Sequence, residues 1–283
     1  MGSAKGTALG PSRHSVRAPR RGLDLFFWLS VTAGATIMAF ILLPLAQMIF
    51  APSLESMGEA LADADVRRAV GLSLLASGAA AAVSLLFGTP LAYLLARREF
   101  PGRKVVESLI DLPIMIPHPV VGIAILGLTG RNHWLGRALQ SLGVQIMGTV
   151  TGIIVVLVFV GLPFYVNAAK AGFQAVPVRV EKAARTLGAT GWQAFWRVTL
   201  PLAWRSILTG VIMCMARAIS EFGAVIIVAY HPMVAPVMIY ERFTAYGLKY
   251  SQPVAVWLIG VSLLLFLSLR LVSRREEAAL DHP

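Results

Sequence analysis

Charged side chains are scarce in this chain, because Asp, Glu, Lys and Arg make up 14% of its 283 residues against 57% hydrophobic residues. A soluble domain carries about 25% charged residues, so this chain has too little charge to cover a surface that faces water. Cysteine is nearly absent, and the single Cys214 can form no disulfide within the chain. A Gly-Lys pair is absent altogether, which excludes a Walker A phosphate loop. The composition therefore indicates an integral membrane protein that lacks its own P-loop ATPase.

Long apolar stretches account for most of the sequence. About 20 mostly apolar helical residues cross the roughly 30 Å hydrocarbon core of a bilayer. Six stretches reach this length, at about 25–50, 69–96, 112–130, 150–169, 206–230 and 252–269. We therefore predict an all-α polytopic membrane protein. Its six-span domain covers residues 25–272, between a basic N-terminal tail (1–24) and a C-terminal tail (273–283).

The cations are distributed unevenly over the predicted loops. Most of the 25 lysines and arginines fall in the two tails and in the loops on the same side as the tails, and few fall in the alternate loops. Cytoplasmic loops of membrane proteins are enriched in Lys and Arg. The distribution therefore predicts that both termini are cytoplasmic.

Prolines predict irregular backbone in two places. Pro113, Pro117 and Pro119 open the third span, and each removes a backbone donor and disturbs a helical turn. Irregular backbone at membrane depth persists only where it is buried in protein or lines a wet cavity, so this segment is predicted to be bent and to face the protein interior. Pro201 predicts a break in the chain ahead of the fifth span.

The segment between the fourth and fifth spans, residues 170–205, is much longer than an ordinary helix connection. Pro177 can start a short helix with an apolar face, and Gly188 can end it in the left-handed conformation. Thr190 and Gln193 have the capping-box spacing for a second helix, which carries aromatic residues. Exposed apolar faces on the cytoplasmic side predict either a protein-docking surface or an amphipathic segment lying on anionic lipid.

The same segment, from residue 178 to 201, resembles the EAA loop of ABC importer permeases. That motif reads Glu-Ala-Ala, three residues, Gly, nine residues, Ile, any residue, Leu-Pro, and the spacing fits at every position. Lys182 stands where the motif has Glu, with Glu181 one residue earlier, and Val198 stands where it has Ile. The resemblance implies that residues 178–188 are a coupling helix for an ATPase. The residues it assigns to this loop are Glu181, Lys182, Ala183, Ala184, Gly188, Val198, Leu200 and Pro201.

Two further segments resemble signatures of molybdate, tungstate and sulfate permeases. Residues 111–117, followed by 120–124, are similar to the third-span signature of that family, and residues 220–225 are similar to its fifth-span signature. His118 stands where many molybdate permeases have a second consecutive proline. Together with the segment 230–237, these residues favour the tungstate and molybdate branch over the sulfate branch.

The resemblance to this family of binding-protein-dependent inner membrane components implies a MetI-like permease fold in the cell inner membrane. It implies a homodimer joined by two ATPase subunits, which would bind ATP and Mg, and by an external oxyanion-binding protein. The chain itself would hold no cofactor and bind no nucleic acid. Its expected function is ATP-driven import of tungstate or molybdate by alternating access. Sulfate or thiosulfate is the rival substrate, and an ion-coupled secondary transporter or a membrane-embedded enzyme is the rival class.

A few residues at membrane depth are candidates for the ion pathway or its gate. Arg217 and Glu221 are four residues apart on one helix face, so they can form an ion pair, which is favoured here over a gate element. His118 is interpreted first as an interior histidine and second as an anion contact. No metal-ligand or catalytic set is recognisable in the sequence. The full candidate set is Pro113, Pro117, His118, Arg217, Ser220, Glu221 and Gly223.

Overall fold

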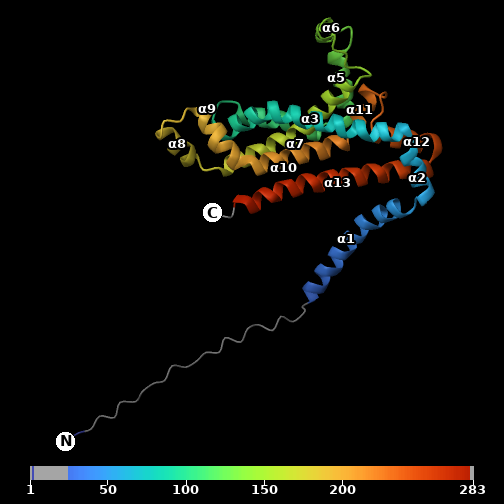
Figure 1. Cartoon of the computed structure of the whole chain (residues 1–283), viewed down its shortest axis with the longest axis horizontal. Coiled ribbons are helices and arrows are strands. Elements are labelled where there is room, and N and C mark those ends of the chain that lie inside the picture. The colour runs from blue at the N-terminus through green and yellow to red at the C-terminus, as the bar shows by residue number, and fades with distance from the viewer. Residues whose placement is uncertain (1, 3–24, 281–283) are drawn as a thin grey trace. The chain divides into compact units, whose positions relative to one another are not determined.

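This computed structural model describes residue 2 and residues 25–280, with side chains described as far as residue 269. The rest of the predicted tail 1–24 lies outside the described residues. All regular structure in the described part is helical (Figure 1). In chain order the elements are α1 (Leu25–Phe50), α2 (Leu54–Ala62), α3 (Ala64–Arg97), α4 (Arg103–Met115), α5 (His118–Thr129), α6 (Trp134–Ser141), α7 (Val150–Ala175), α8 (Val178–Thr186), α9 (Gly191–Ala194), η1 (Phe195–Thr199), α10 (Leu200–Ile219), α11 (Gly223–Val228), α12 (Ala235–Tyr246) and α13 (Leu248–Leu280).

The chain divides into two compact units, residues 1–47 and 48–283. The described part of the first unit belongs to α1, which has no charged side chain and is apolar on every face. A helix of this composition and length suits a membrane span. The second unit contains all the other helices and both candidate sites.

Helices of membrane-spanning length agree with the predicted fold class. Five are long and apolar enough: α1, α3, α7, the continuous helix Gly191–Ile219 and the part of α13 up to Leu269. The pair α4 and α5 makes a sixth span if its two helices are counted together, and they meet at an angle of 113°. The predicted bend in the third span is therefore confirmed. The helix itself begins earlier than the apolar stretch, because α4 starts at Arg103.

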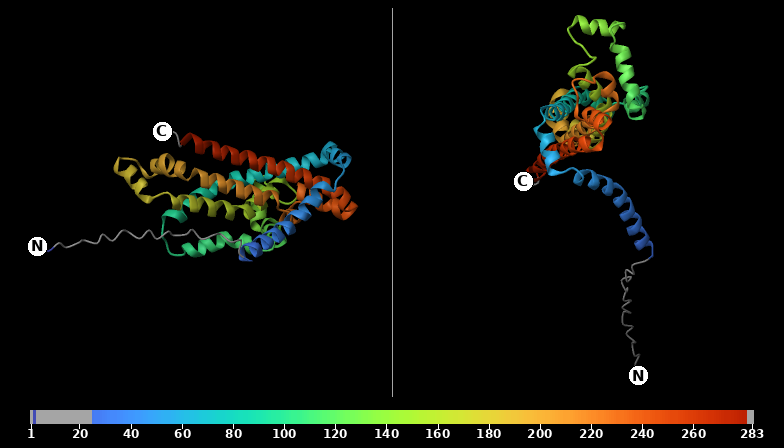
Figure 2. Two further views of the ribbon diagram at one scale, coloured as in Figure 1. Left: turned by 90° about the horizontal axis from the view of Figure 1, so that it is seen from below. Right: turned by 90° about the vertical axis from the view of Figure 1, so that its right-hand side faces the viewer.

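The centre of the second unit is formed by α3, α7 and α10, which lie side by side (Figures 1 and 2). Small residues permit this close approach. A Cβ added to Gly161 of α7 would lie 2.6 Å from the sulfur of Cys214 in α10, and one added to Gly172 would lie 2.3 Å from Cβ of Ser206. Because lipid removes the hydrophobic drive for helix association, such tight van der Waals packing is the main source of attraction between the helices.

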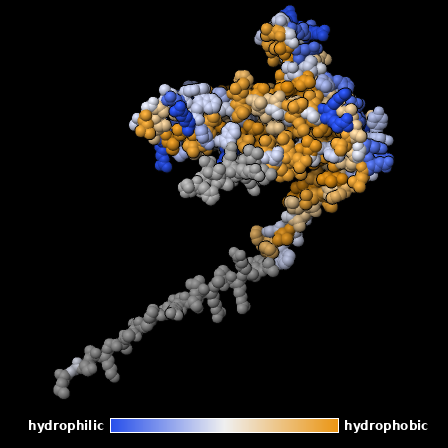
Figure 3. Space-filling view, in the orientation of Figure 1, coloured by the Kyte–Doolittle hydropathy of each residue, from blue (hydrophilic) through white to orange (hydrophobic). Residues whose placement is uncertain are grey.

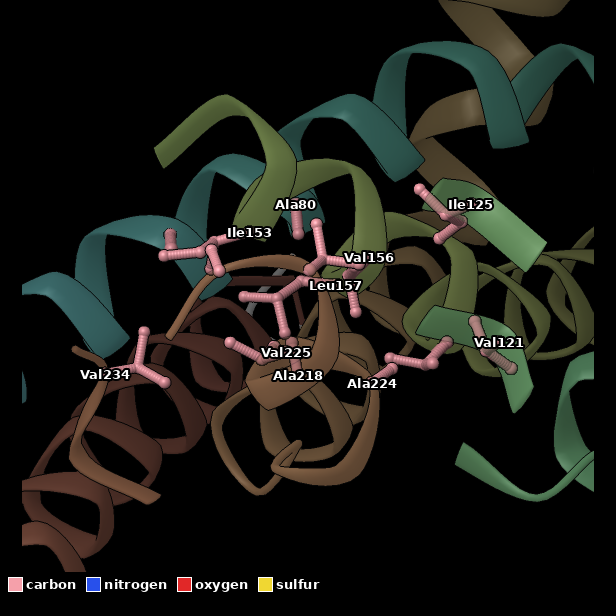
Figure 4. Close-up of a cluster of buried hydrophobic side chains, with 14 of the residues drawn as sticks. Ala80, Val121, Ile125, Ile153, Val156, Leu157, Ala218, Ala224, Val225 and Val234 are labelled. Carbon is pink, nitrogen blue, oxygen red and sulfur yellow. The ribbon is translucent and has the colours of Figure 1, made fainter. Parts of the chain in front are cut away.

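The buried core extends from these helices to α5 and α11. Figure 4 shows side chains of five helices meeting in one cluster, among them Ala80, Val121, Val156, Ala218 and Val225. The core thereby fixes α5 and α11, which carry residues of the candidate gate, against α3, α7 and α10.

Polar contacts attach α4 to α7. Asn167 of α7 donates a hydrogen bond of 2.6 Å to Asp111, and Lys170 forms an ion pair of 3.3 Å with Glu107. Only Pro113 of α4 is buried, and much of the helix's apolar surface is exposed. Side-chain polar bonds therefore supplement the packing of Val106 and Ile110 against the core in attaching α4.

The start of the fifth span differs from the prediction, because Pro201 does not break the chain. The helix runs without interruption from Gly191 to Ile219. Residues Phe195–Thr199 widen into a π-helical turn, in which the N–H of Leu200 bonds the carbonyl of Phe195. A wider turn accommodates a proline ring that would clash in a regular α-helix. The prediction was wrong because it treated the proline as a terminator.

The end of the fifth span was also placed wrongly, at residue 230. The helix α10 ends at Ile219, and the short helix α11 begins at Gly223 after a turn. The carboxylate of Glu221 accepts a hydrogen bond of 2.8 Å from the N–H of Ala224 in the first turn of α11. An apolar stretch alone does not reveal such a side-chain cap.

Hydrophobic and hydrophilic residues occupy different parts of the second unit along its length. On the face shown in Figure 3, hydrophobic residues cover the middle, whereas hydrophilic residues gather around α8 and α9 at one end and around α2 and α12 at the other. An apolar band between two polar ends is the pattern of a bundle that crosses a bilayer.

Candidate functional site

The candidate coupling loop ends its first helix and begins its second as predicted, although the second helix is not short and continues to Ile219. Gly188 follows α8 with a φ of 93°, and its N–H bonds the carbonyl of Arg185. Thr190 and Gln193 form the predicted capping box, with reciprocal bonds of 3.2 and 2.9 Å. Both predictions are confirmed. The loop is shorter than expected, because α7 continues to Ala175.

The outer face of α8 carries apolar and basic side chains. Leu187 is 90% exposed and Val180 is 37% exposed, whereas Ala184 is half-buried. Arg179 and Lys182 are exposed on the same short helix. Such a mixed apolar and basic surface suits a partner that is itself amphipathic.

Glu181 is turned away from this surface and holds α8 to the bundle. Its Oε1 accepts hydrogen bonds from Nε of Arg97 at 2.8 Å and from the hydroxyl of Thr199 at 2.8 Å. Arg97 also donates to the carbonyl of Val176 at 3.0 Å. The side chains of Arg97 and Glu181 are only 9% and 13% exposed. One carboxylate therefore joins α8 to the end of α3 and to η1.

The remaining residues of the motif lie where η1 meets α10. Val198 and Leu200 are half-buried on either side of the buried Thr199, and Pro201 is exposed in the first turn of α10. The two halves of the motif thus meet at the Glu181–Thr199 hydrogen bond. The role of Arg97 could not be predicted from the sequence, because no spacing rule relates it to Glu181.

The predicted aromatic face of the second helix is divided between two environments. Phe195 points inward, where its ring lies 4.9 Å from Tyr93 and 6.0 Å from Phe173, measured between centroids. Trp192 is 70% exposed and Trp196 is 49% exposed. Phe195 therefore anchors the loop, and the tryptophans are available for contact.

A second cluster forms where helices are interrupted. Arg217, in the last turn of α10, donates a hydrogen bond of 2.6 Å to Glu221, which confirms the predicted ion pair. The guanidinium also lies 2.9 Å from Nε2 and 3.0 Å from Nδ1 of His118, the first residue of α5. Glu221 is 1% exposed, and it also lies 3.5 Å from His118. The structure thus brings three predicted residues together at the ends of α5, α10 and α11.

Glycines allow the interrupted helices α5 and α11 to touch. A Cβ added to Gly223 would lie 3.0 Å from Cβ of His118, and one added to Gly122 would lie 2.7 Å from the carbonyl of Ala224. The other predicted gate residues are Pro113, which is buried in α4, and two residues next to this contact in the chain. Pro117 caps α5, whereas Ser220 is exposed and bonds the carbonyl of Arg217.

The other polar end contains an open cavity of about 630 Å³, whose charged lining residues are Glu55, Glu59, Asp63, Arg242 and Lys249. Asp63 accepts a hydrogen bond from Arg242, which ties α12 to the start of α3. Burial raises the pKa of Asp63, but the bonds from Arg242 and from the N–H of Asp65 outweigh that effect, so its pKa lies below the ordinary value. Within the described residues, no cluster of His, Cys, Asp or Glu could hold a metal ion.

The class of this protein follows from a match to a protein family, which agrees with its bundle of long apolar helices and its EAA-like loop. Residues 88–277 match the family described as binding-protein-dependent transport system inner membrane component, and the chain belongs to this family. The structure resembles the solved bacterial alginate ABC transporter in complex with its periplasmic protein, with a TM-score of 0.71 and 19% identity over 89% of this chain and 94% of that chain. It also resembles the MetNI methionine ABC transporter, with a TM-score of 0.59 and 17% identity over 77% of this chain and 96% of that chain. At these identities the likeness shows the fold.

Several permease proteins resemble this chain in sequence more than these two solved transporters do. The chain is 43% identical to the molybdate/tungstate transport system permease protein WtpB of Thermococcus kodakarensis, over 90% of this chain and 99% of the relative. It is 45% identical to WtpB of Pyrococcus furiosus, over 87% of this chain and 94% of the relative. Identity to the sulfate transport system permease protein CysT of Synechocystis is 30%, over 91% of this chain and 94% of the relative.

Proposed function

We propose that this chain is the membrane-spanning permease subunit of an ATP-driven importer and that its cargo is tungstate or molybdate. The observation that carries the proposal is the 43% identity to a molybdate/tungstate permease over nearly the whole of both chains. Sulfate is the second candidate, because a sulfate permease is 30% identical over a similar length. Tungstate, molybdate and sulfate are all tetrahedral dianions, so the same architecture suits each.

The proposed complex contains two copies of this chain, two ATPase subunits that bind ATP and Mg, and an external oxyanion-binding protein. The complex is placed in the cell inner membrane, with both termini of this chain in the cytoplasm. The basic face of α8 supports this orientation, because cytoplasmic segments of membrane proteins are rich in Lys and Arg. The absence of a Walker A loop assigns ATP hydrolysis to the partner subunits.

The contacts of α8 suggest how ATP binding moves the membrane helices. When the ATPase subunits close, they would displace the coupling helices bound to them, and a rigid attachment would carry that displacement into the bundle. Glu181 provides such an attachment, because its carboxylate bonds both Arg97 of α3 and Thr199 of η1. A displacement of α8 therefore reaches α3 and α10 directly.

The cluster of Arg217, Glu221 and His118 is the proposed gate region. It lies at the ends of three helices and contains the fully buried Glu221, so its rearrangement would alter the packing of α5 against α11. Charged groups at membrane depth are costly and commonly mark a pathway. The proposed gate comprises Pro113, Pro117, His118, Arg217, Ser220, Glu221 and Gly223.

Two substitutions in the coupling loop test its role. Gly188→Glu and Ala184→Arg are expected to uncouple ATP hydrolysis from transport by at least about tenfold, because each places a bulky side chain on the docking surface and prevents close packing of the partner. The measurements are oxyanion uptake and ATP hydrolysis by the complex in proteoliposomes. Insertion of the variants into the membrane should be normal.

Gly102→Glu is the matched control for Gly188→Glu. Gly102 has a similar φ of 86° and open space beside its Cα, so the substitution adds the same charge and the same backbone strain outside the loop. Normal coupling in both loop variants, or equal uncoupling by Gly102→Glu, would contradict the assignment of the coupling helix.

The function as a whole is tested on the purified complex. We expect an ATPase to co-purify with the tagged chain and its activity to be stimulated by binding protein loaded with tungstate or molybdate. Stimulation by the sulfate-loaded protein alone would assign the chain to sulfate import. If no ATPase bound and uptake followed a proton or sodium gradient, the chain would be a secondary transporter.

A further inference from the structure

The charged residues of α8 are separated by sign. Arg179, Lys182 and Arg185 are exposed, whereas Glu181, the one acidic residue of the helix, points into the bundle. Lys182 stands at the position where the EAA pattern has Glu. The surface that α8 presents therefore contains three cations and no carboxylate.

The carboxylate of Glu181 does not offset these cations. It pairs with Arg97, whose Nη2 lies 2.7 Å from Oε1, and the side chains of both residues are largely buried. A buried pair of opposite charges has no net charge and produces only a weak field at the surface. The electrostatic potential over α8 is thus set by Arg179, Lys182 and Arg185.

An exposed apolar residue accompanies this basic surface. Leu187 is 90% exposed at the end of α8, immediately before the left-handed Gly188, and Val178 is 47% exposed at the other end. A partner that covered these two side chains would remove their apolar surface from water, which is favourable. Figures 1 and 2 both show α8 at the tip of the second unit, beyond the ends of α7 and α10.

We infer that α8 binds a groove on the ATPase subunit that has an acidic rim and an apolar floor. Carboxylates on the rim would pair with Arg179 and Lys182, and the floor would receive Leu187. This inference rests on the proposed function, because it takes the ATPase as the partner of the coupling helix. The basic surface of α8 favours an acidic rim, since opposite potentials accelerate association and select the correct partner.

The firm attachment of α8 favours a protein partner over a lipid surface. A helix that lies on anionic lipid needs only basic and apolar side chains. The helix α8 is also bonded to α3 and η1 through Glu181, and this attachment lets it transmit a displacement. The position of α8 at the tip of the second unit likewise exposes it to a partner that approaches from that end.

The test is the affinity of the permease for the ATPase that co-purifies with it, measured in nanodiscs of phosphatidylcholine over a range of salt concentrations. The double variant Arg179→Glu/Lys182→Glu should weaken assembly at least about tenfold at low salt, because attraction becomes repulsion. The loss should shrink as salt rises, since exposed charges are screened. Lys104→Glu changes an exposed cation on α4 and is the control, for which we expect no change.

Leu187→Asp separates failure of this inference from failure of the proposed function. If Leu187→Asp weakens assembly while the double variant behaves like Lys104→Glu, α8 is a coupling helix but the acidic groove is refuted. If neither change affects assembly, the coupling-helix assignment fails and the inference fails with it. If the double variant is defective only in nanodiscs that contain about 30% phosphatidylglycerol, the basic face binds lipid and the inference is overturned.

Discussion

Glu181→Ala is expected to lower the free energy of unfolding by about 3–5 kcal/mol, because it leaves the guanidinium of Arg97 buried without its counter-charge. The substitution also removes the shorter hydrogen bond of the buried Thr199 hydroxyl, which is left with the carbonyl of Ala194 at 3.4 Å. In detergent, the midpoint of thermal unfolding should fall by roughly 10 °C. The coupling of ATP hydrolysis to transport should fall as well, because α8 loses its bonds to α3 and η1.

Asp65→Asn is the matched control for this experiment. Asp65 forms an ion pair with Arg68 in which both side chains are more than 70% exposed, so removing it should change stability very little. The combination Glu181→Gln with Arg97→Met should recover most of the lost stability, since neither buried charge then remains. It should not recover full coupling, because α8 has lost its bond to α3, although the glutamine amide can still accept the hydrogen bond from Thr199 of η1. Equal effects of Glu181→Ala and Asp65→Asn would show that the Glu181 carboxylate does not hold α8.

Glu221→Gln should also cost about 3–5 kcal/mol, even though glutamine has the same shape as glutamate. The amide oxygen can still accept the hydrogen bond from Ala224, so the cap of α11 is retained. The charge of Arg217 is no longer balanced, however, and its side chain is only 18% exposed. Thermal unfolding is the measurement, with Glu55→Gln at an exposed carboxylate as the control.

A paired substitution distinguishes a gate from a purely structural ion pair. Arg217→Met combined with Glu221→Gln removes both charges and should restore most of the stability that Glu221→Gln loses. If the pair acts in gating, uptake of oxyanion by the complex stays impaired although the ATPase still assembles, and this is the outcome that we expect. Uptake at the wild-type rate would identify the pair as structural.

Much of the fold could be predicted from local patterns. The apolar stretches predicted the helices α1, α3 and α7 close to their observed bounds, and the prolines predicted the bend between α4 and α5. The left-handed Gly188 and the capping box at Thr190 were also predictable. Each of these features depends on residues within a few positions of one another, so their spacing in the sequence is sufficient.

The predictions were wrong where the backbone departs from a regular α-helix, which neither the proline rule nor the apolar pattern reveals. Pro201 predicts a helix end, but a π-helical turn at Phe195–Thr199 absorbs it and the helix continues. The apolar run of the fifth span continues to residue 230, but Glu221 caps a new helix after a turn. Composition cannot distinguish one straight helix from two helices joined by a capped turn.

The sequence by itself determined that this chain is an all-helical membrane protein, that its EAA-like loop contains a short helix followed by a capping box, and that Arg217 can pair with Glu221. Only the tertiary structure decided that Glu181 faces Arg97, 84 residues away, and that His118 joins the pair in α10 and its following turn. The physical reason is that a cap or an i, i+4 pair is specified by the backbone geometry of one segment. The partner of a buried charge is specified by how separate helices pack, and here that packing depends on close contacts at residues such as Gly161 and Gly122.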